Sequence, residues 1–244
     1  MKKLIMAITI LFLSGNSIFG QNLDKKGFAL LELYTSEGCS SCPPADELMG
    51  RIQNEYKDSN VYVLSYHVDY WDKQGWKDAF SSQLYTARQY EYAQFLGKEP
   101  IYTPQLIING KNDFVGSQET VIRNGIKAAL SKPASISLSL SASYTVNKLA
   151  LRYNVEGNSK NSSLVIAVVQ KSAKSNVKRG ENAHRILLHY QIVQQLHKID
   201  LNKDSKGNTV LVPPRNFNPQ DFEVIGFVQN QKNGHILDVS KVIF

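Results

Sequence analysis

Cysteine is scarce in this chain: only Cys39 and Cys42 carry a thiol among 244 residues. A small exported domain that depends on disulfides for its stability usually has several pairs joining distant segments. A single pair separated by two serines closes a loop too short to restrict the unfolded chain much. The scarcity of cysteine therefore argues against a fold that disulfide bonds stabilise. It favours redox use of the two thiols, with an inert structural disulfide as the alternative.

Long apolar runs are also missing. The apolar stretch 4–13 is too short for a comfortable membrane span, and no later stretch is long and apolar enough to form one. It follows Lys2 and Lys3 and precedes the small residue Gly20, which is typical of a signal peptide over residues 1–20. An uncleaved N-terminal anchor is the alternative. A lipoprotein anchor is excluded, because it requires a cysteine at the cleavage site and none lies near it.

A dense basic stripe is the third absence. The formal charge is +7 at pH 7, but the lysines and arginines are spread along the chain and are not interleaved with aromatic residues. This distribution predicts a solvated basic surface and no nucleic-acid partner. We expect an exported protein, periplasmic or extracellular, with no stable membrane span; outer-membrane association and the oligomeric state are left open.

The first half of the chain alternates between strand-like and helix-like patterns. Strands are predicted at 27–35, 61–68, 106–108 and 113–116, and helices at 43–57, 77–96 and 118–130. Ser131 to Pro133 marks a boundary, after which serines alternate with apolar residues. Further strands are predicted at 136–140, 149–155, 164–169, 209–212, 224–229 and 236–239. Residues 181–200 fit a strand or a helix. We predict two domains, 27–131 and 134–244.

Several motifs carry a resemblance to a known family. They are Cys39-Ser40-Ser41-Cys42-Pro43-Pro44-Ala45-Asp46, His67 to Asp72, Arg88-Gln89, Tyr102 to Gln105, and Arg179 to Asn182. Together they resemble a secreted bacterial thioredoxin-like family of unknown function, within the thioredoxin-like superfamily. The resemblance implies an α/β thioredoxin-like domain, which we expect to be followed by a mostly antiparallel β-sandwich-like domain. Two departures stand out: Ser40-Ser41 replaces Gly-Pro, and Gly38 stands where thioredoxins place a tryptophan.

The cysteine pair is the candidate catalytic centre. A thiolate at a helix N-terminus is stabilised by free backbone N–H groups and by the helix dipole. Cys39 is expected to lie nearer to solvent and to act as the nucleophile, and Cys42 to resolve the mixed disulfide. Pro43 and Pro44 complicate this expectation, because they could delay the regular helix and weaken the dipole at Cys39.

Other candidates surround this pair. The resemblance implies that Pro104 is cis and, with Thr103, lays the backbone alongside an extended substrate. Glu32 lies inside an apolar strand, and the resemblance implies a buried acid that moves protons; a strand-end glutamate bonded to the backbone or to Arg88 is the alternative. Finally, four aromatic residues could form the rim of a peptide site, with a place in the core as the alternative; they are Trp71, Tyr102, Tyr70 and Trp76.

His67 and Asp69 stand at the end of the second predicted strand, where parallel sheets bind ligands. They could act as an acid–base pair for Cys39, or His67 could join the thiolates in a copper site; a loop-fixing network of His67, Asp69, Tyr70 and Asp72 is favoured over both. No resident metal or cofactor is expected. The sequence thus predicts thiol–disulfide exchange with an exported protein or a small thiol. A binding or assembly protein and a copper carrier are the alternatives.

Overall fold

The computed structural model describes residues 26–244, so the predicted signal peptide lies outside the described residues. Strands account for 43% and helices for 18% of the structure. Over residues 26–244, no helix is long and apolar enough to cross a membrane.

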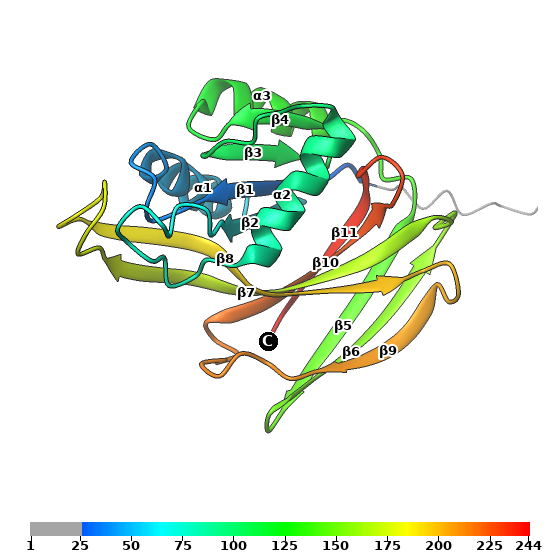
Figure 1. The fold of residues 1–244 in the computed structure, drawn as a ribbon. Helices are drawn as coiled ribbons and strands as arrows, with labels where there is room; N and C mark the ends of the chain where they lie inside the picture. The colour runs from blue at the N-terminus through cyan, green and yellow to red at the C-terminus, as the bar shows by residue number, and fades with distance from the viewer. Residues whose placement is uncertain (1–25) are drawn as a thin grey trace, which may run out of the picture.

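The first half contains the predicted alternation of strands and helices (Figure 1). Its elements are β1 (Ala29–Thr35), α1 (Pro43–Glu55), β2 (Val61–His67), α2 (Gln83–Leu96), β3 (Gln105–Ile108), β4 (Asn112–Val115) and α3 (Glu119–Leu130). Helix α2 begins six residues later than predicted, because the Ser82 side chain caps it by accepting a hydrogen bond from the Leu84 N–H. It ends at Gly97 in the left-handed conformation, as predicted.

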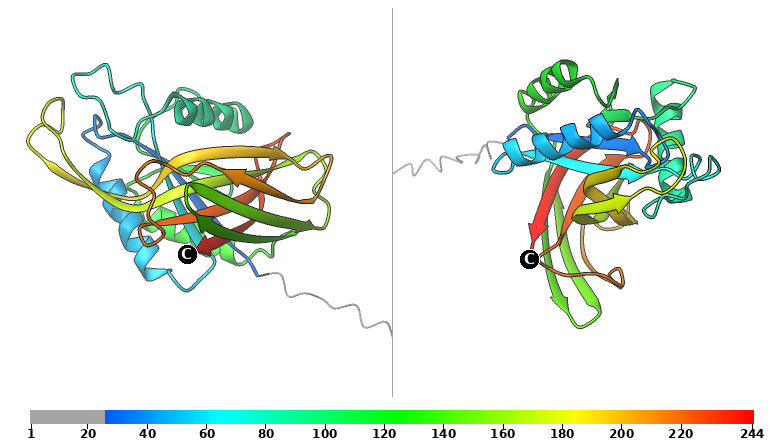
Figure 2. Two further views of the ribbon diagram at one scale, coloured as in Figure 1. Left: turned by 90° about the horizontal axis from the view of Figure 1, so that it is seen from below. Right: turned by 90° about the vertical axis from the view of Figure 1, so that its left-hand side faces the viewer.

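The second half is entirely β in structure. Its strands are β5 (Ser137–Thr145), β6 (Lys148–Glu156), β7 (Ser162–Asn176), β8 (Ile186–Asp200), β9 (Lys206–Leu211), β10 (Phe222–Asn230) and β11 (Ile236–Ile243). The ambiguous segment 181–200 is therefore mainly strand, and it pairs along its length with β7. Together β7 and β8 form a long hairpin that projects from the body of the molecule (Figure 2).

The predicted fold class is wrong. An α/β thioredoxin-like domain followed by a separate β-sandwich would give two unconnected sheets, one in each half. Instead, one mixed eight-stranded sheet runs β11-β10-β7-β8-β2-β1-β3-β4, and only β5-β6-β9 form a second sheet. The halves join where β2 pairs in parallel with β8 at Ser65 and Ile192. In addition, the Ser65 hydroxyl donates to the Tyr190 carbonyl at 2.7 Å.

The hydrophobic core explains this continuity. One face of β1 packs against α1 and α3, whereas the other face carries Leu30 and Tyr34 towards α2. The same cluster contains Val165 of β7 and Phe227 of β10, so α2 covers strands from both halves. The opposite face of β7 and β10 packs on the three-stranded sheet. A pattern read locally along the sequence does not reveal this long-range pairing.

Candidate functional site

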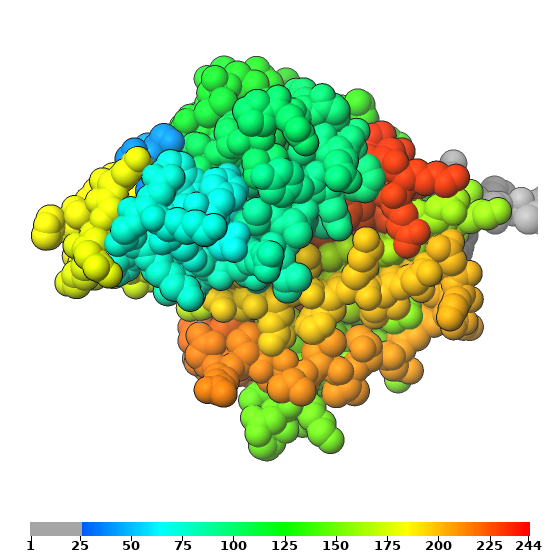
Figure 3. All heavy atoms as spheres, in the orientation of Figure 1, coloured from blue at the N-terminus to red at the C-terminus, as the bar shows by residue number. Residues whose placement is uncertain are grey.

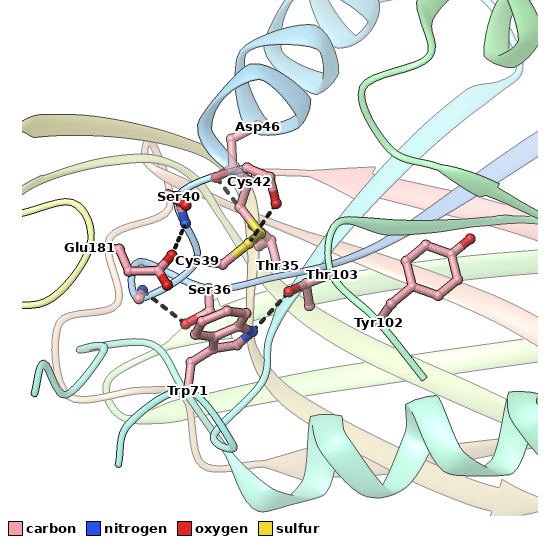
Figure 4. Close-up of a disulfide and its surroundings, with 12 residues drawn as sticks. Thr35, Ser36, Cys39, Ser40, Cys42, Asp46, Trp71, Tyr102, Thr103 and Glu181 are labelled. Carbon is pink, nitrogen blue, oxygen red and sulfur yellow. Dashed lines mark hydrogen bonds between the residues drawn. A yellow bond between two sulfur atoms is a disulfide. The ribbon is translucent and has the colours of Figure 1, made fainter. Parts of the chain in front are cut away.

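The cysteine pair lies in the turn between β1 and α1. Cys39 and Cys42 form a disulfide with their Cα atoms 5.4 Å apart (Figure 4). Cys42 is the N-cap residue of α1, and its carbonyl accepts hydrogen bonds from the N–H groups of Ala45 and Asp46 at 2.9 and 3.1 Å. Regular helix thus begins immediately after Cys42, at Pro43. The two prolines do not delay it, because the first helical N–H groups need no partner within the helix.

Both sulfur-bearing residues are buried, with Cys39 only 1% and Cys42 0% exposed. Only the intervening Ser40 and Ser41 are exposed. The Ser41 hydroxyl lies 3.3 Å from the sulfur of Cys39, within hydrogen-bond reach. The expectation that Cys39 lies near solvent is therefore wrong, and the cause is a cover supplied by other parts of the chain.

The tip of the β7–β8 hairpin (residues 177–185) forms one part of this cover. The Asn182 amide donates to the carbonyls of Glu37 and Cys39, each at 2.9 Å, and is itself fully buried. The Glu181 carboxylate accepts a bond from the Ser40 N–H at 3.0 Å, and hydrogen bonding with the side chain and then the backbone of Ser40 lowers the pKa of Glu181. Figure 3 shows the hairpin packed against the loop that follows β2. The second half of the chain thus completes the surroundings of the disulfide.

Trp71 and Thr103 form another part of the cover. The indole Nε1 donates to the Thr103 hydroxyl at 2.8 Å, beside the disulfide (Figure 4). A Cβ atom on Gly38 would lie 3.1 Å from the Trp71 Cβ, so Trp71 fills the space next to Gly38. Pro104 is buried and its peptide bond is cis, as predicted from the resemblance.

Tyr102 does not join this group, because its ring points away from the disulfide (Figure 4). Its hydroxyl bonds to the Asp113 carboxylate at 3.1 Å. Burial, with the charge of Asp113, raises the pKa of Tyr102 to about 12. The structure therefore brings Trp71 and Thr103 to the cysteines and leaves Tyr102 at the strand edge.

Glu32 belongs to a different cluster on the α2 side of the sheet. Its carboxylate accepts from Arg88 at 2.7 Å and from the Tyr92 hydroxyl. Arg88 also donates to the Gln229 amide oxygen of β10 and to Tyr92, both at 3.1 Å. We call Glu32, Arg88, Tyr92 and Gln229 the Arg88 cluster. Each carboxylate oxygen of Glu32 accepts a hydrogen bond within this cluster. The pairing with Arg88 is the one that the sequence analysis gave as an alternative.

His67 and Asp69 do not contact one another as an acid–base pair would. The Asp69 carboxylate accepts from the Thr86 hydroxyl of α2 at 2.6 Å, while the His67 Nδ1 lies 2.6 Å from the Asp78 carboxylate. Asp78 also accepts from the Glu37 N–H at 2.8 Å. These contacts fix the loop after β2 to the turn before the cysteines.

Sequence reasoning missed a second buried ionic cluster beneath the cysteine turn. His189 of β8 lies with Nε2 3.4 Å from Glu37 and Nδ1 3.8 Å from Asp46. Its ring centre is 4.9 Å from that of His67, which brings in Asp78 as well. We call Glu37, Asp46, His67, Asp78 and His189 the His189 cluster. The only feature of the sequence that indicated this cluster was the position of Glu37 and Asp46 next to the cysteines. No neighbouring residue indicated that His189 belongs to it.

Opposite charges lie close together inside the His189 cluster. Burial disfavours the cationic form of His189, but its close polar contacts with Asp46 and Glu37 and the charges of these two carboxylates outweigh burial and raise its pKa to about 9. Burial also acts to raise the pKa of Glu37, yet the contact with His189 at 3.4 Å contributes most to lowering it overall. Similarly, the charge of His67 overcomes burial and lowers the pKa of Asp78. Near neutral pH, His189 is thus a buried cation between carboxylates.

Within residues 26–244, no group of three or more His, Cys, Asp or Glu side chains is arranged to hold a metal ion. The His67 ring is turned towards Asp78 and His189.

Comparison with known proteins places the chain in a family. Residues 30–229 match the family described as "Protein of unknown function (DUF1223)", and the chain belongs to it. It is similar to an Agrobacterium tumefaciens protein of known crystal structure, with 27% identity and a TM-score of 0.67. That match covers 88% of this chain and 93% of the other, so the two share this mixed fold.

Other similarities are weak. A domain of the outer membrane lipoprotein Omp28 from Porphyromonas gingivalis is 17% identical, with a TM-score of 0.27. It covers 45% of this chain and 87% of that domain, and the low score supports no conclusion about this protein. No curated protein matches the chain.

Proposed function

We propose that this member of DUF1223 carries out thiol–disulfide exchange through Cys39 and Cys42, with an exported protein or a small thiol as its partner. The observation that supports it best is the disulfide itself. It joins residues three apart at the start of α1, where its closure adds little to the fold. The N-terminal sequence pattern supports export, which would place the protein in the periplasm or outside the cell.

The exchange conserves atoms and electrons as follows. A partner thiolate attacks the sulfur of Cys39, the bond between the two sulfurs breaks, and Cys42 leaves as a thiolate. A second partner thiol then attacks the mixed disulfide and releases the oxidised partner. Two thiols become one disulfide, and Cys39 and Cys42 gain two electrons and two protons. In the reverse sequence the Cys39 thiolate attacks a partner disulfide, Cys42 resolves the mixed disulfide, and the partner is reduced.

Surrounding groups have limited roles in this scheme. In this scheme Thr103 and Pro104 position the backbone of the partner, and the bond from the Trp71 indole holds Thr103 in place. Glu32 has no proton-transfer step, because Arg88 and Tyr92 occupy both of its carboxylate oxygens. Since both cysteines are buried and Asn182 of the hairpin tip bonds to the Cys39 carbonyl, movement of the tip away from Cys39 gives a partner access to it.

Trapping with oxidised glutathione tests the proposal. In Cys42→Ser, Cys39 has no resolving partner, so a glutathione adduct should accumulate on it and be detected by mass. Cys39→Ser is the matched control: its only thiol is Cys42, which should form the adduct more slowly. The same Cys42→Ser variant, expressed in its source cell, should retain its protein partner as a mixed disulfide on a non-reducing gel.

Burial of both cysteines favours one alternative, a binding or assembly protein that keeps an inert disulfide. In that case neither variant forms an adduct, and alkylation of the reduced protein shows two equally unreactive thiols. That outcome would overturn the exchange proposal.

A further inference from the structure

The His189 cluster brings a residue of the second half to the cysteine turn. Glu37 precedes Cys39 by two residues, and Asp46 follows Cys42 by four. His189 lies between their carboxylates, with its two ring nitrogens directed to one each, at 3.4 and 3.8 Å. A single imidazole therefore connects both ends of the segment that the disulfide closes.

These contacts are unusual for a buried polar group. Glu37, Asp46 and His189 are each at most 4% exposed, yet neither ring nitrogen of His189 makes a well-aligned hydrogen bond. Glu37 Oε1 lacks one too, although its Oε2 accepts from the Trp76 indole at 2.6 Å. In a purely structural network, buried polar groups are rarely left without a hydrogen bond. The attraction here is electrostatic and tolerates small movements of the turn.

We propose that His189 is a positioning residue for exchange at Cys39–Cys42: it holds Glu37 and Asp46 together while the disulfide is closed and so sets how readily the pair is reduced. The inference rests on the proposed exchange function and adds to it a residue that lies 150 positions from Cys39 in the chain.

The electrostatic surroundings of His189 support this role. From the loop before the cysteines it faces Glu37, and from α1 it faces Asp46. From β2 it faces the His67 ring, which in turn bonds to Asp78, and the Phe80 ring packs against both imidazoles. Its pKa is raised to about 9 by the two carboxylates, so it is protonated at neutral pH.

Reduction should alter this arrangement. The disulfide fixes the distance between the two parts of the turn that carry Glu37 and Asp46. When the bond between the sulfurs breaks, the turn can relax, and two ionisable thiols replace an uncharged disulfide. The affinity of His189 for its proton then differs between the oxidised and reduced proteins, and this difference is coupled to the reduction equilibrium.

Equilibration with reduced and oxidised glutathione at several pH values tests the inference. The fraction of oxidised protein is measured by alkylation and mass. We expect His189→Gln to change the equilibrium constant at pH 7 by roughly tenfold, the factor that corresponds to one pKa unit of coupling. The difference between the variant and the natural protein should fade above pH 9, where His189 loses its proton. A second variant, His189→Lys, retains a cation and should recover part of the natural value.

His197→Gln is the matched control. His197 lies on the same strand, is half-buried, and contacts Gln195 rather than a carboxylate. It should leave the equilibrium constant and its pH dependence unchanged. Equal constants and identical pH profiles for His189→Gln and the natural protein would overturn the inference while leaving the exchange function in place. A disulfide that resists glutathione altogether would overturn both.

A measurement on the unmutated protein guards against a variant that fails to fold. The imidazole proton resonances of His189 can be titrated in the oxidised and the reduced protein. We expect two different pKa values, one in each redox state. The same value in both states would contradict the inference, whatever the variants show.

Discussion

Two buried ionic clusters lie on neighbouring parts of the large sheet, and they are built differently. In the Arg88 cluster, all three guanidinium nitrogens donate to oxygen atoms of Glu32, Gln229 or Tyr92. In the His189 cluster, both imidazole nitrogens of the central cation lack an aligned bond. The first cluster is specified by geometry and the second by charge.

This difference shows what each cluster can do. A planar guanidinium with every nitrogen bonded holds β1, α2 and β10 in one arrangement and resists movement. An imidazole held at 3.4 to 3.8 Å between carboxylates keeps its attraction through small shifts and can lose its charge near pH 9. We therefore assign stability of the fold to the Arg88 cluster and adjustment of the cysteine turn to the His189 cluster.

Removing the guanidinium should give the largest effect. Arg88→Met keeps much of the side-chain volume but leaves the Glu32 carboxylate buried and unpaired, which costs about 3–5 kcal/mol of stability. Urea unfolding of the oxidised protein measures this loss. Arg123→Met is the control, because Arg123 pairs with Glu55 and Glu119 at the surface and should change stability far less. Similar losses in both variants would contradict the distinction between the clusters.

Only part of this arrangement is predictable from sequence. Local sequence patterns were sufficient to predict α1, the Asn109-Gly110 turn and the Gly97 cap, because neighbouring residues determine each of these features. The cysteine motif was visible for the same reason. The joining of β8 to β2 was not, since a single parallel bridge at Ser65 and Ile192 leaves no periodic signal.

The same limit explains what was missed at the site. The spacing of His189 from other histidines suggests no ligand set, and its role depends on Glu37 and Asp46, more than 140 residues earlier in the chain. Burial of Cys39 was missed because Asn182 covers it from the far hairpin. The glycine at position 38 has a structural reason that only the fold reveals: Trp71 occupies the adjacent space.

The charge of His189 should make the stability of the protein depend on pH. Its pKa is raised from 6.5 to about 9 on folding, so its stabilising contribution is complete below pH 6.5 and is lost as the pH rises through 9. We expect the free energy of unfolding to fall by up to roughly 3 kcal/mol across this range. His189→Gln should flatten the curve. Urea unfolding at half-unit pH intervals measures the slope, and parallel curves for the two proteins would show that the cluster does not hold this charge.

The cover over the disulfide gives the smallest expected change in stability and a direct change in reactivity. Asn182→Ala removes the two amide bonds to the carbonyls of Glu37 and Cys39, which should cost about 1–3 kcal/mol. The loss falls on the contact between the hairpin tip and the cysteine turn, so local opening becomes more frequent without global unfolding.

Dithiothreitol should then reduce the disulfide of Asn182→Ala about tenfold faster than that of the natural protein, a factor that corresponds to roughly 1.4 kcal/mol. The rate of reduction is measured by quenching samples with an alkylating reagent and determining the masses of the products. Asn208→Ala is the matched control, since Asn208 is a residue of β9 that bonds to Arg152 in the separate three-stranded sheet. If both variants react at the natural rate, the hairpin tip does not control access. The partner would then have to reach Cys39 from the side of Trp71 and Thr103, where the cover depends on a single indole bond.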